Sequence, residues 1–233
     1  MKKRILLLAV VALSISSMAL PAAQAAESRY ITVKAQGTVK VVPDAVRINA
    51  TATNLASTNK DALSATSKTA AAIRAALKTA KIDSKDIATT SITTFPEYKY
   101  GNDGTTTLLG YRATQSFTIT VKAANTAGAL VDSLVAAGGD SVQINGVSPF
   151  VLDSTKATES ARAIAVKNAK SRALSYAKLL GVSLGKVNYL TEDSSPVPPA
   201  PIFATAKSEA DATVVDLGQQ DVTVAITVQW SLR

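Results

Sequence analysis

The chain has 233 residues, of which 47% are hydrophobic and 18% charged, and it carries a formal net charge of +8 without a single cysteine or histidine. These absences exclude disulfides, zinc sites built on cysteine or histidine, and nucleophilic catalysis that depends on histidine. The cations are scattered among acidic residues, so the positive charge predicts a solvated surface and no nucleic-acid partner. The composition still allows three kinds of chemistry: acid–base catalysis by carboxylates, nucleophilic catalysis by a serine–lysine pair, and binding of calcium or magnesium by oxygen ligands.

The first 25 residues have the pattern of an export signal. Cations at residues 2–4 precede an apolar run over 5–20, and Ala-Gln-Ala at 23–25 supplies the small residues of a cleavage site. The apolar run is shorter than the ~20 residues of a membrane-spanning helix, so we expect cleavage and not retention as an anchor. We predict that residues 1–25 are a signal peptide and that 26–233 form a domain in the periplasm, at the cell envelope or secreted. No later segment predicts a transmembrane helix, although peripheral association with the envelope stays open.

Two strands are predicted at the start of the mature chain. The first covers residues 30–42 and ends at Pro43, because proline cannot donate to a strand ladder. Apolar and polar residues alternate over 45–55, which is the period of a half-buried strand. The two strands form either a hairpin or a bend around Pro43 and Asp44. We interpret Asp44 as a residue that caps nearby amides, with a binding edge as the alternative.

The middle of the chain combines strand and helix signals. The predicted elements are a helix over residues 59–80, strands over 87–100 and 106–121, a helix over 126–137 and a strand over 141–152. Thr58 precedes Asp61 at the spacing of a helix cap, and Asn145-Gly146 indicates a bulge, a turn or an edge position in the last strand. The order of elements over residues 45–152 predicts a split βαβ sandwich as a first submodule.

A long alanine-rich helix is predicted over residues 155–180. Alanine recurs at every fourth position, which lets a helix pack closely against a sheet. Arg172 falls among the apolar positions, where it pairs with a carboxylate or extends past the alanines. The opposite side carries lysines that we interpret as a solvated face, with an anionic-surface binder as the alternative. These lysines are Lys156, Lys167, Lys170 and Lys178.

The C-terminal part completes an α+β fold. The remaining predicted elements are a short strand at 186–190, a proline-rich loop or linker at 194–201 and a strongly alternating strand at 222–232. Together with the strand 30–42, residues 153–233 form a second submodule. The predicted architecture is therefore antiparallel strands with packed helices, in which a βαββαβ-like core precedes the alanine-rich helix and the C-terminal strands.

Several motifs in this order resemble the SIMPL-domain family, exported bacterial proteins also called the periplasmic immunogenic or oxidative-stress-defence group. The stretch Gly-Thr-Val-Lys-Val-Val-Pro-Asp-Ala at 37–45 is similar to the family's opening signature, and Gly-Tyr-Arg-Ala at 110–113 is similar to its Gly-Tyr motif. The segment 77–89 and the alanine-rich helix resemble further family segments. At Lys81 the chain departs from the pattern, because relatives often have glycine there. The motif residues are Gly37, Pro43, Asp44, Ala45, Gly110 and Tyr111, which we interpret as structural.

The resemblance implies an α+β protein of the cell envelope that tends to self-associate and has no established catalytic residues. It assigns no metal and no cofactor. From it we predict an exported, non-enzymatic homo-oligomer that supports envelope integrity or stress tolerance. The ligand, if there is one, and the molecular activity are not indicated by the sequence.

An envelope-polymer hydrolase that uses carboxylates or a serine–lysine pair is an alternative. Ser57 with Lys60, and Ser175 with Lys178, have the spacing of a serine–lysine acylase pair. The companion motifs of that enzyme class are missing, and such spacings arise often by chance. The acidic pairs Asp83 with Asp86 and Glu192 with Asp193 lack the further oxygen ligands and glycine turn of a calcium site, so surface loops explain them better.

A solute- or peptide-binding module is the third alternative. Tyr98, Tyr100 and Tyr111 are predicted to gather near the hairpin at 101–104 together with Lys99 and Arg112. Such a group would form a stacking or glycan-contacting patch. The competing interpretation is ordinary cross-strand packing of aromatic side chains, which we favour.

Overall fold

A four-stranded antiparallel sheet forms the core of the middle segment. In the computed structural model, which describes residues 29–193 and 213–233, the strands β2 (Ala45–Ala56), β3 (Ile87–Tyr100), β4 (Thr106–Val121) and β5 (Val142–Phe150) pair in the order β3-β4-β2-β5. Strand β4 lies between β2 and β3 and is antiparallel to both, which is the predicted split βαβ arrangement. The predicted signal peptide and the proline-rich segment at 194–201 lie outside the described residues.

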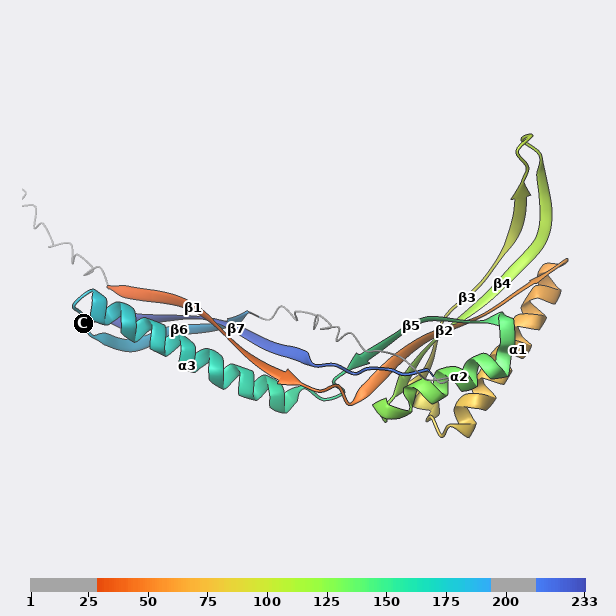
Figure 1. Ribbon diagram of the computed structural model, residues 1–233. Helices are drawn as coiled ribbons and strands as arrows, with labels where there is room; N and C mark the ends of the chain where they lie inside the picture. The colour runs from red at the N-terminus through yellow and green to blue at the C-terminus, as the bar shows by residue number, and fades with distance from the viewer. Residues whose placement is uncertain (1–28, 194–212) are drawn as a thin grey trace, which may run out of the picture.

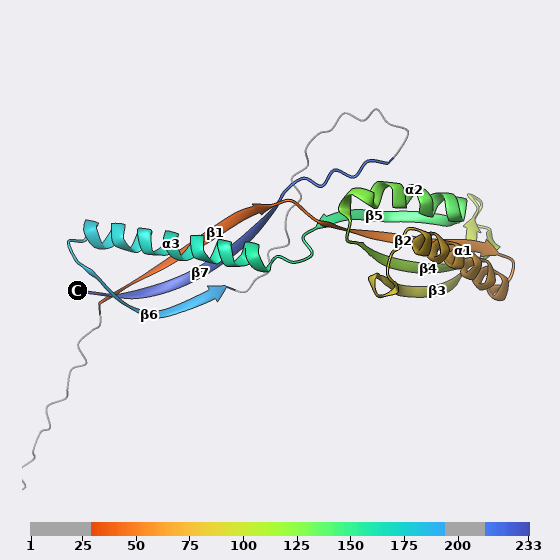
Figure 2. The same ribbon diagram turned by 90° about the horizontal axis from the view of Figure 1, so that it is seen from below.

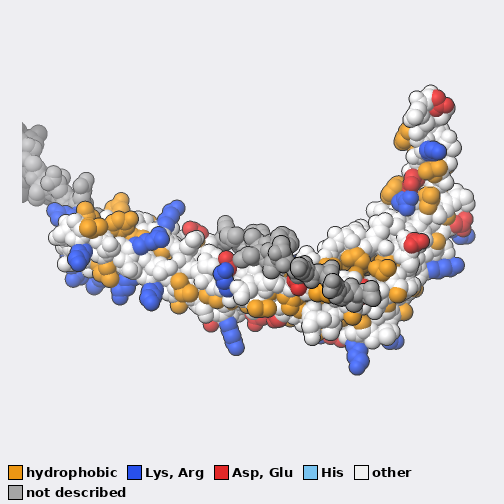
Figure 3. Space-filling view, viewed as in Figure 1, with side chains coloured by type: hydrophobic (Ala, Val, Ile, Leu, Met, Phe, Trp, Pro, Cys, Tyr) orange, Lys and Arg blue, Asp and Glu red, His pale blue; other side chains and the backbone are white. Residues whose placement is uncertain are grey.

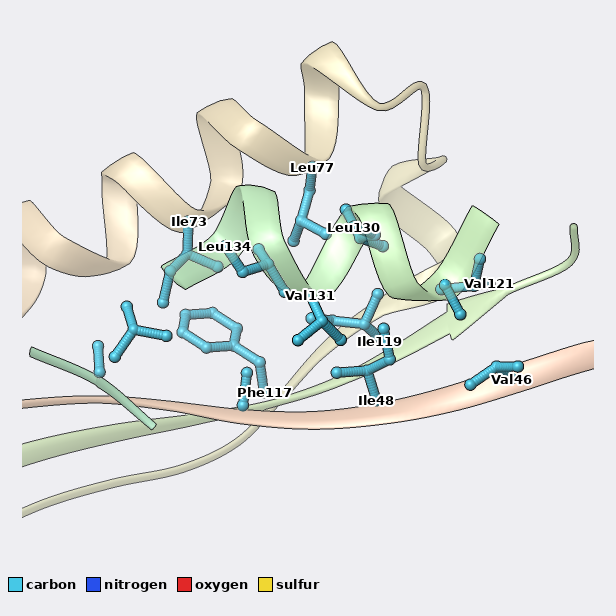
Figure 4. Packing of buried hydrophobic residues seen from close by; sticks show 14 of the residues in the cluster. Val46, Ile48, Ile73, Leu77, Phe117, Ile119, Val121, Leu130, Val131 and Leu134 are labelled. Atoms are coloured by element: carbon cyan, nitrogen blue, oxygen red, sulfur yellow. The ribbon is translucent and has the colours of Figure 1, made fainter. Parts of the chain in front are cut away.

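Two helices, α1 (Asn59–Thr79) and α2 (Ala127–Gly138), cover one face of this sheet (Figure 2). Figure 4 shows Phe117 of β4 against the sheet, with Ile73 of α1 and Leu134 of α2 above it. All three side chains are buried, and each contributes about 1.5–3 kcal/mol to folding at this depth. The predicted cap of α1 is confirmed, because Thr58 Oγ1 accepts a hydrogen bond from the Asp61 amide at 3.1 Å.

A three-stranded sheet forms the other end of the molecule. Strands β1 (Tyr30–Val41), β7 (Gln220–Leu232) and β6 (Leu184–Asp193) pair in the order β1-β7-β6, and α3 (Thr155–Leu179) covers one face (Figure 1). The predicted alanine stripe is confirmed as the buried side of α3. Its members are Ala161, Ala165, Ala169, Ala173 and Ala177. Apolar side chains of β1 and β7, including Ile226 and Trp230, pack against the first four of these alanines.

Two polar side chains of α3 that lie close to the alanine stripe also contact the sheet edge. Arg172 extends past the alanines, and its Nη1 donates a hydrogen bond to the Lys34 carbonyl at 3.1 Å. Its partner is therefore a main-chain oxygen, and not the carboxylate that the sequence left as the other possibility. One turn earlier, Asn168 Nδ2 donates to the Gln36 carbonyl at 2.9 Å. Both acceptors belong to the edge strand β1, so α3 occupies hydrogen-bonding groups that an open edge would present to other strands. The four predicted lysines of α3 are exposed, and Figure 3 shows cationic side chains along this part of the surface.

Strands β1 and β2 lie in different sheets. β1 pairs with β7 along its whole length, from Tyr30 opposite Ser231 to Val41 opposite Gln220, whereas β2 pairs with β4 and β5. The hairpin alternative is therefore wrong, and residues 42–44 form the bend. The bulge and edge position predicted near Asn145 are confirmed, because β5 is an edge strand whose register with β2 shifts there.

Polar contacts join the segments that connect the two sheets. Asp44 Oδ1 accepts a hydrogen bond from the Leu152 amide at 2.8 Å, and Gln220 Nε2 donates to the Pro149 carbonyl at 2.6 Å. The two sheets lie end to end in an elongated molecule (Figures 1 and 2). Within residues 29–193 and 213–233, no helix combines the length and the apolarity that crossing a bilayer requires.

Candidate functional site

The β3–β4 hairpin extends beyond the rest of its sheet. The pairing of β2 with β4 ends where Ala56 lies opposite Tyr111, but β3 and β4 continue to pair as far as Tyr100 opposite Thr106. Residues 97–110, which we call the arm, therefore form a two-stranded ribbon, and no third strand from residues 29–193 or 213–233 pairs with it. Figure 1 shows this ribbon projecting from the body of the molecule.

Gly110 sits at the base of the arm, where β4 passes the end of β2. Its φ is +147°, and a Cβ at this position would lie 2.4 Å from the Ala56 carbonyl oxygen. The strand register shifts here, because Glu97 pairs with Gly110 but Tyr98 pairs with Leu108, leaving Leu109 as an extra residue. Such a bulge bends its strand. A side chain at position 110 would therefore meet both an unfavourable φ and the Ala56 carbonyl where the arm leaves the sheet, whereas glycine fits there.

An ion pair joins the two strands at the same base. Arg112 Nη2 donates to Glu97 Oε1 at 2.8 Å, and Arg112 Nε donates to Glu97 Oε2. The hydrogen bonds from Arg112 lower the pKa of Glu97 and those to Glu97 raise the pKa of Arg112, with desolvation opposing both shifts. The bidentate pair fixes the orientation of the strands at the point where the third strand ends.

The three predicted tyrosines share one face of the hairpin. Tyr98 and Tyr100 alternate with Lys99 along β3, and Tyr111 lies directly opposite Pro96, two residues before Tyr98. Lys99 falls on the other face, which also carries the Glu97–Arg112 pair. The structure therefore brings the tyrosines together but separates them from the two cations with which they were predicted to gather.

Apolar side chains of the arm are exposed to solvent. The exposed fractions are 44% for Tyr98, 74% for Tyr100, 46% for Leu108 and 48% for Leu109. Figure 3 shows apolar side chains along the projecting ribbon. The tip is held by polar contacts of its own, because Asp103 Oδ1 accepts hydrogen bonds from the amide and hydroxyl of Thr105, which also lower the pKa of Asp103. The arm thus presents an ordered apolar surface that its own module does not cover.

The leucines of this surface were missed by the sequence-based reasoning. Leu108 and Leu109 looked like ordinary strand residues, yet a signal was available in the lengths of the strands. β3 and β4 have 14 and 16 residues, whereas β2 between β4 and β5 has 12. Two long strands joined by a tight turn, such as β3 and β4, must extend beyond the end of a shorter neighbouring strand such as β2.

The opening motif lies in a different part of the molecule. A Cβ on Gly37 would lie 2.1 Å from the Ala161 carbonyl oxygen, so this glycine lets β1 approach α3 closely. Asp44 makes the contact with Leu152 described above, and Ala45 is fully buried opposite Phe150. The motif residues therefore do not converge on one site, because they serve the α3 contact, the bend and the base of the arm.

The candidate catalytic groups stay apart or have structural partners. Ser57 and Ser175 are exposed, and within the described residues no hydrogen bond joins either one to its lysine. Asp83 pairs with Lys85, Asp86 with Lys122, and Glu192 with Arg162. In the part of the chain that the structure describes, no group of three acidic side chains comes together to hold a metal ion.

These features define the chain as an α+β protein with two helix-covered antiparallel sheets and a projecting hairpin. Residues 31–230 match the model of the SIMPL family, described as a protein of unknown function (DUF541), and the chain belongs to this family.

Similar proteins come from several bacteria. The 26 kDa periplasmic immunogenic protein of Brucella melitensis biotype 1 is 29% identical over 214 residues, covering 87% of this chain and 84% of the relative. The uncharacterized protein YggE of Edwardsiella ictaluri is 29% identical over 212 residues, covering 85% and 84%. YggE of Escherichia coli K12 is 28% identical over 214 residues, covering 90% and 84%.

Proposed function

We propose that this SIMPL-family protein is exported to the periplasm or cell envelope, associates with copies of itself through the arm, and supports envelope integrity or stress tolerance without catalysing a reaction. The observation that carries the proposal is the arm itself. It is an ordered two-stranded ribbon whose tyrosines and leucines are exposed.

The arm has two properties of an association surface. Isolated two-stranded hairpins are marginally stable in water, so burying the apolar side chains of this ribbon against a partner would be favourable. Within the described part of the chain, each strand of the arm also has an unpaired edge, because β2 ends at Ala56 beside β4 and because β3 is an edge strand of the sheet. Free edges of this kind pair readily with further strands, and a second copy of the chain offers a strand of matching length.

The proposed location has separate support. Residues 1–25 have the pattern of a signal peptide, and the Brucella relatives are named as periplasmic proteins. Fractionation of cells that express the full chain tests this part. A product shortened at its N-terminus in the extracytoplasmic fraction is expected, and an unprocessed cytoplasmic product would contradict it.

The assembly part is tested by the molar mass of purified residues 26–233, measured by light scattering over a wide range of concentrations. We expect a mass above that of the monomer. In the double variant Tyr100→Glu, Leu108→Glu the mass should fall towards the monomer, because charges placed on the arm cannot be buried. The matched control is Leu179→Glu, an exposed leucine at the end of α3. A wild-type protein that stays monomeric would overturn the proposal, and so would an arm variant that assembles as well as the wild type.

A further inference from the structure

A pocket lies at the end of the four-stranded module away from the arm. It is an open pocket formed where α1 ends, where β4 ends, and where α2 begins, with a volume of about 410 Å³. Gly110 at the arm base and Val121 at the pocket are eleven positions apart on β4, about 35 Å along a strand. The volume falls within the range of sites for small organic molecules. The pocket is therefore a second feature of this module, separate from the proposed association surface.

The floor of the pocket is apolar. Val121 of β4 and Leu130 of α2 belong to the buried core cluster, and Ile82 packs against the same cluster. Figure 4 shows Leu130 and Val121 at the end of the cluster near the loop that follows Leu77. An apolar group in the pocket would thus contact the edge of the core, where Ile82 is only partly buried, and lose contact with water.

Lys81 lines this pocket in a backbone conformation that lysine rarely adopts. Its φ is +59°, and among the described residues it is the only one other than glycine with a positive φ. The Lys81 amide donates to the Lys78 carbonyl and the Ile82 amide donates to the Leu77 carbonyl, which is the Schellman pattern of a helix end. α3 ends in the same pattern, but with Gly181 at the equivalent position and a φ of +67°. The chain thus uses glycine at one such end and keeps a lysine at the end that borders the pocket.

Four charged side chains line the pocket, namely Lys81, Asp83, Asp86 and Lys122, and each of the two carboxylates pairs with an ammonium group. Asp86 Oδ2 accepts from Lys122 Nζ at 2.6 Å, and Asp83 lies 3.3 Å from the Lys85 ammonium. Within residues 29–193 and 213–233, Lys81 has no ion-pair partner. An ammonium group next to an apolar floor favours a ligand that combines a negative charge with an apolar portion.

We propose that this pocket binds a small organic anion with an apolar chain, of the class represented by medium-chain carboxylates. The carboxylate lies against the Lys81 ammonium, and the chain lies on Val121, Leu130 and Ile82. The Lys122–Asp86 pair stays intact and borders the ligand. This proposal does not depend on self-association of the arm, and its outcome is read separately from the molar mass.

The test uses residues 26–233 and decanoate as the probe, with calorimetry for affinity and NMR shifts of the Val121 and Leu130 amides for location. Saturable binding that moves these amides is expected. Decanol, which lacks the charge, and acetate, which lacks the chain, should each bind at least about tenfold more weakly, because each loses one of the two contacts.

Three variants locate the site. Lys81→Gly removes the ammonium at a position where glycine fits the backbone, so the fold is retained while decanoate binding weakens by about tenfold or more. Ala129→Phe fills the pocket from an exposed position of α2 and should also abolish binding. Lys68→Ala is the matched control, since Lys68 is an exposed lysine earlier on α1 that does not line the pocket, and it should bind as the wild type does. No saturable decanoate binding, equal binding of decanol, or unchanged binding in Lys81→Gly would each overturn the proposal.

Discussion

Lys81 and Gly181 occupy the same position in two helix ends of one chain. Each follows the last turn of its helix with a positive φ, +59° for Lys81 and +67° for Gly181, and each is followed by an apolar residue whose amide bonds back to the helix. A side chain at such a φ is unfavourable because its Cβ crowds the backbone, whereas glycine adopts this conformation freely. Lys81 therefore lowers the stability of the fold through its backbone conformation, whereas Gly181 does not.

Replacing Lys81 with glycine should stabilise the fold. We expect the free energy of unfolding to rise by about 1 kcal/mol, because the strain of the left-handed conformation is removed. Urea unfolding followed by circular dichroism measures the change. The reciprocal variant Gly181→Lys should lower stability by a similar amount, and a Lys81→Gly protein less stable than the wild type would show that the lysine makes a compensating contact.

A methyl group at Gly37 should be strongly unfavourable. The added Cβ would lie 2.1 Å from the Ala161 carbonyl oxygen and 2.5 Å from the Ala165 amide nitrogen, both of which are backbone atoms that cannot turn away. We expect Gly37→Ala to destabilise the protein by about 1–3 kcal/mol, the range of overpacked cores. Thermal unfolding provides the measurement. Gly146→Ala is the control, since only Asn49 Nδ2, at 3.9 Å, approaches that position, and its melting temperature should hardly change.

Loss of the Asp44 carboxylate should loosen the bend between the sheets. Asp44 Oδ1 accepts the Leu152 amide at 2.8 Å, so Asp44→Ala leaves that amide to water and costs about 1 kcal/mol. Hydrogen exchange at Leu152 should accelerate in this variant, while exchange in the α1–α2 core stays slow. Unchanged protection of the Leu152 amide would show that the contact does not hold the connection in solution.

The Glu97–Arg112 pair should make the base of the arm sensitive to acid. Hydrogen bonds from Arg112 lower the pKa of Glu97 below 4.5, so its folded value lies beneath the unfolded one. The pair therefore stabilises the arm fully above that unfolded value, and the contribution is lost as the pH falls through the folded pKa. An NMR titration of the Glu97 side chain should give a midpoint below 4.5 that rises towards it in Arg112→Gln. An identical midpoint in the variant would show that the pair does not form in solution.

Local features of the fold could be predicted from the sequence because they depend on nearby residues. The strand periods, the cap from Thr58 to Asp61 and the alanine stripe of α3 follow from backbone geometry and from hydrogen bonds that span a few positions. The βαββαβ order followed in the same way, since turn and helix signals separate its elements. The motif residues that carried the family resemblance were likewise visible, although not the contacts that explain them.

The partners of strands and side chains were decided only by the tertiary structure. The pattern of β1 is equally compatible with pairing to β2, the next strand in sequence, and with its actual partner β7 at the far end of the chain. An alternating strand does not encode which neighbour it meets, because many partners satisfy the same pattern and the free energy of the whole chain selects one. For the same reason the exposed arm and the pocket beside Lys81 could not be read from the sequence, as each exists only where separate elements end together.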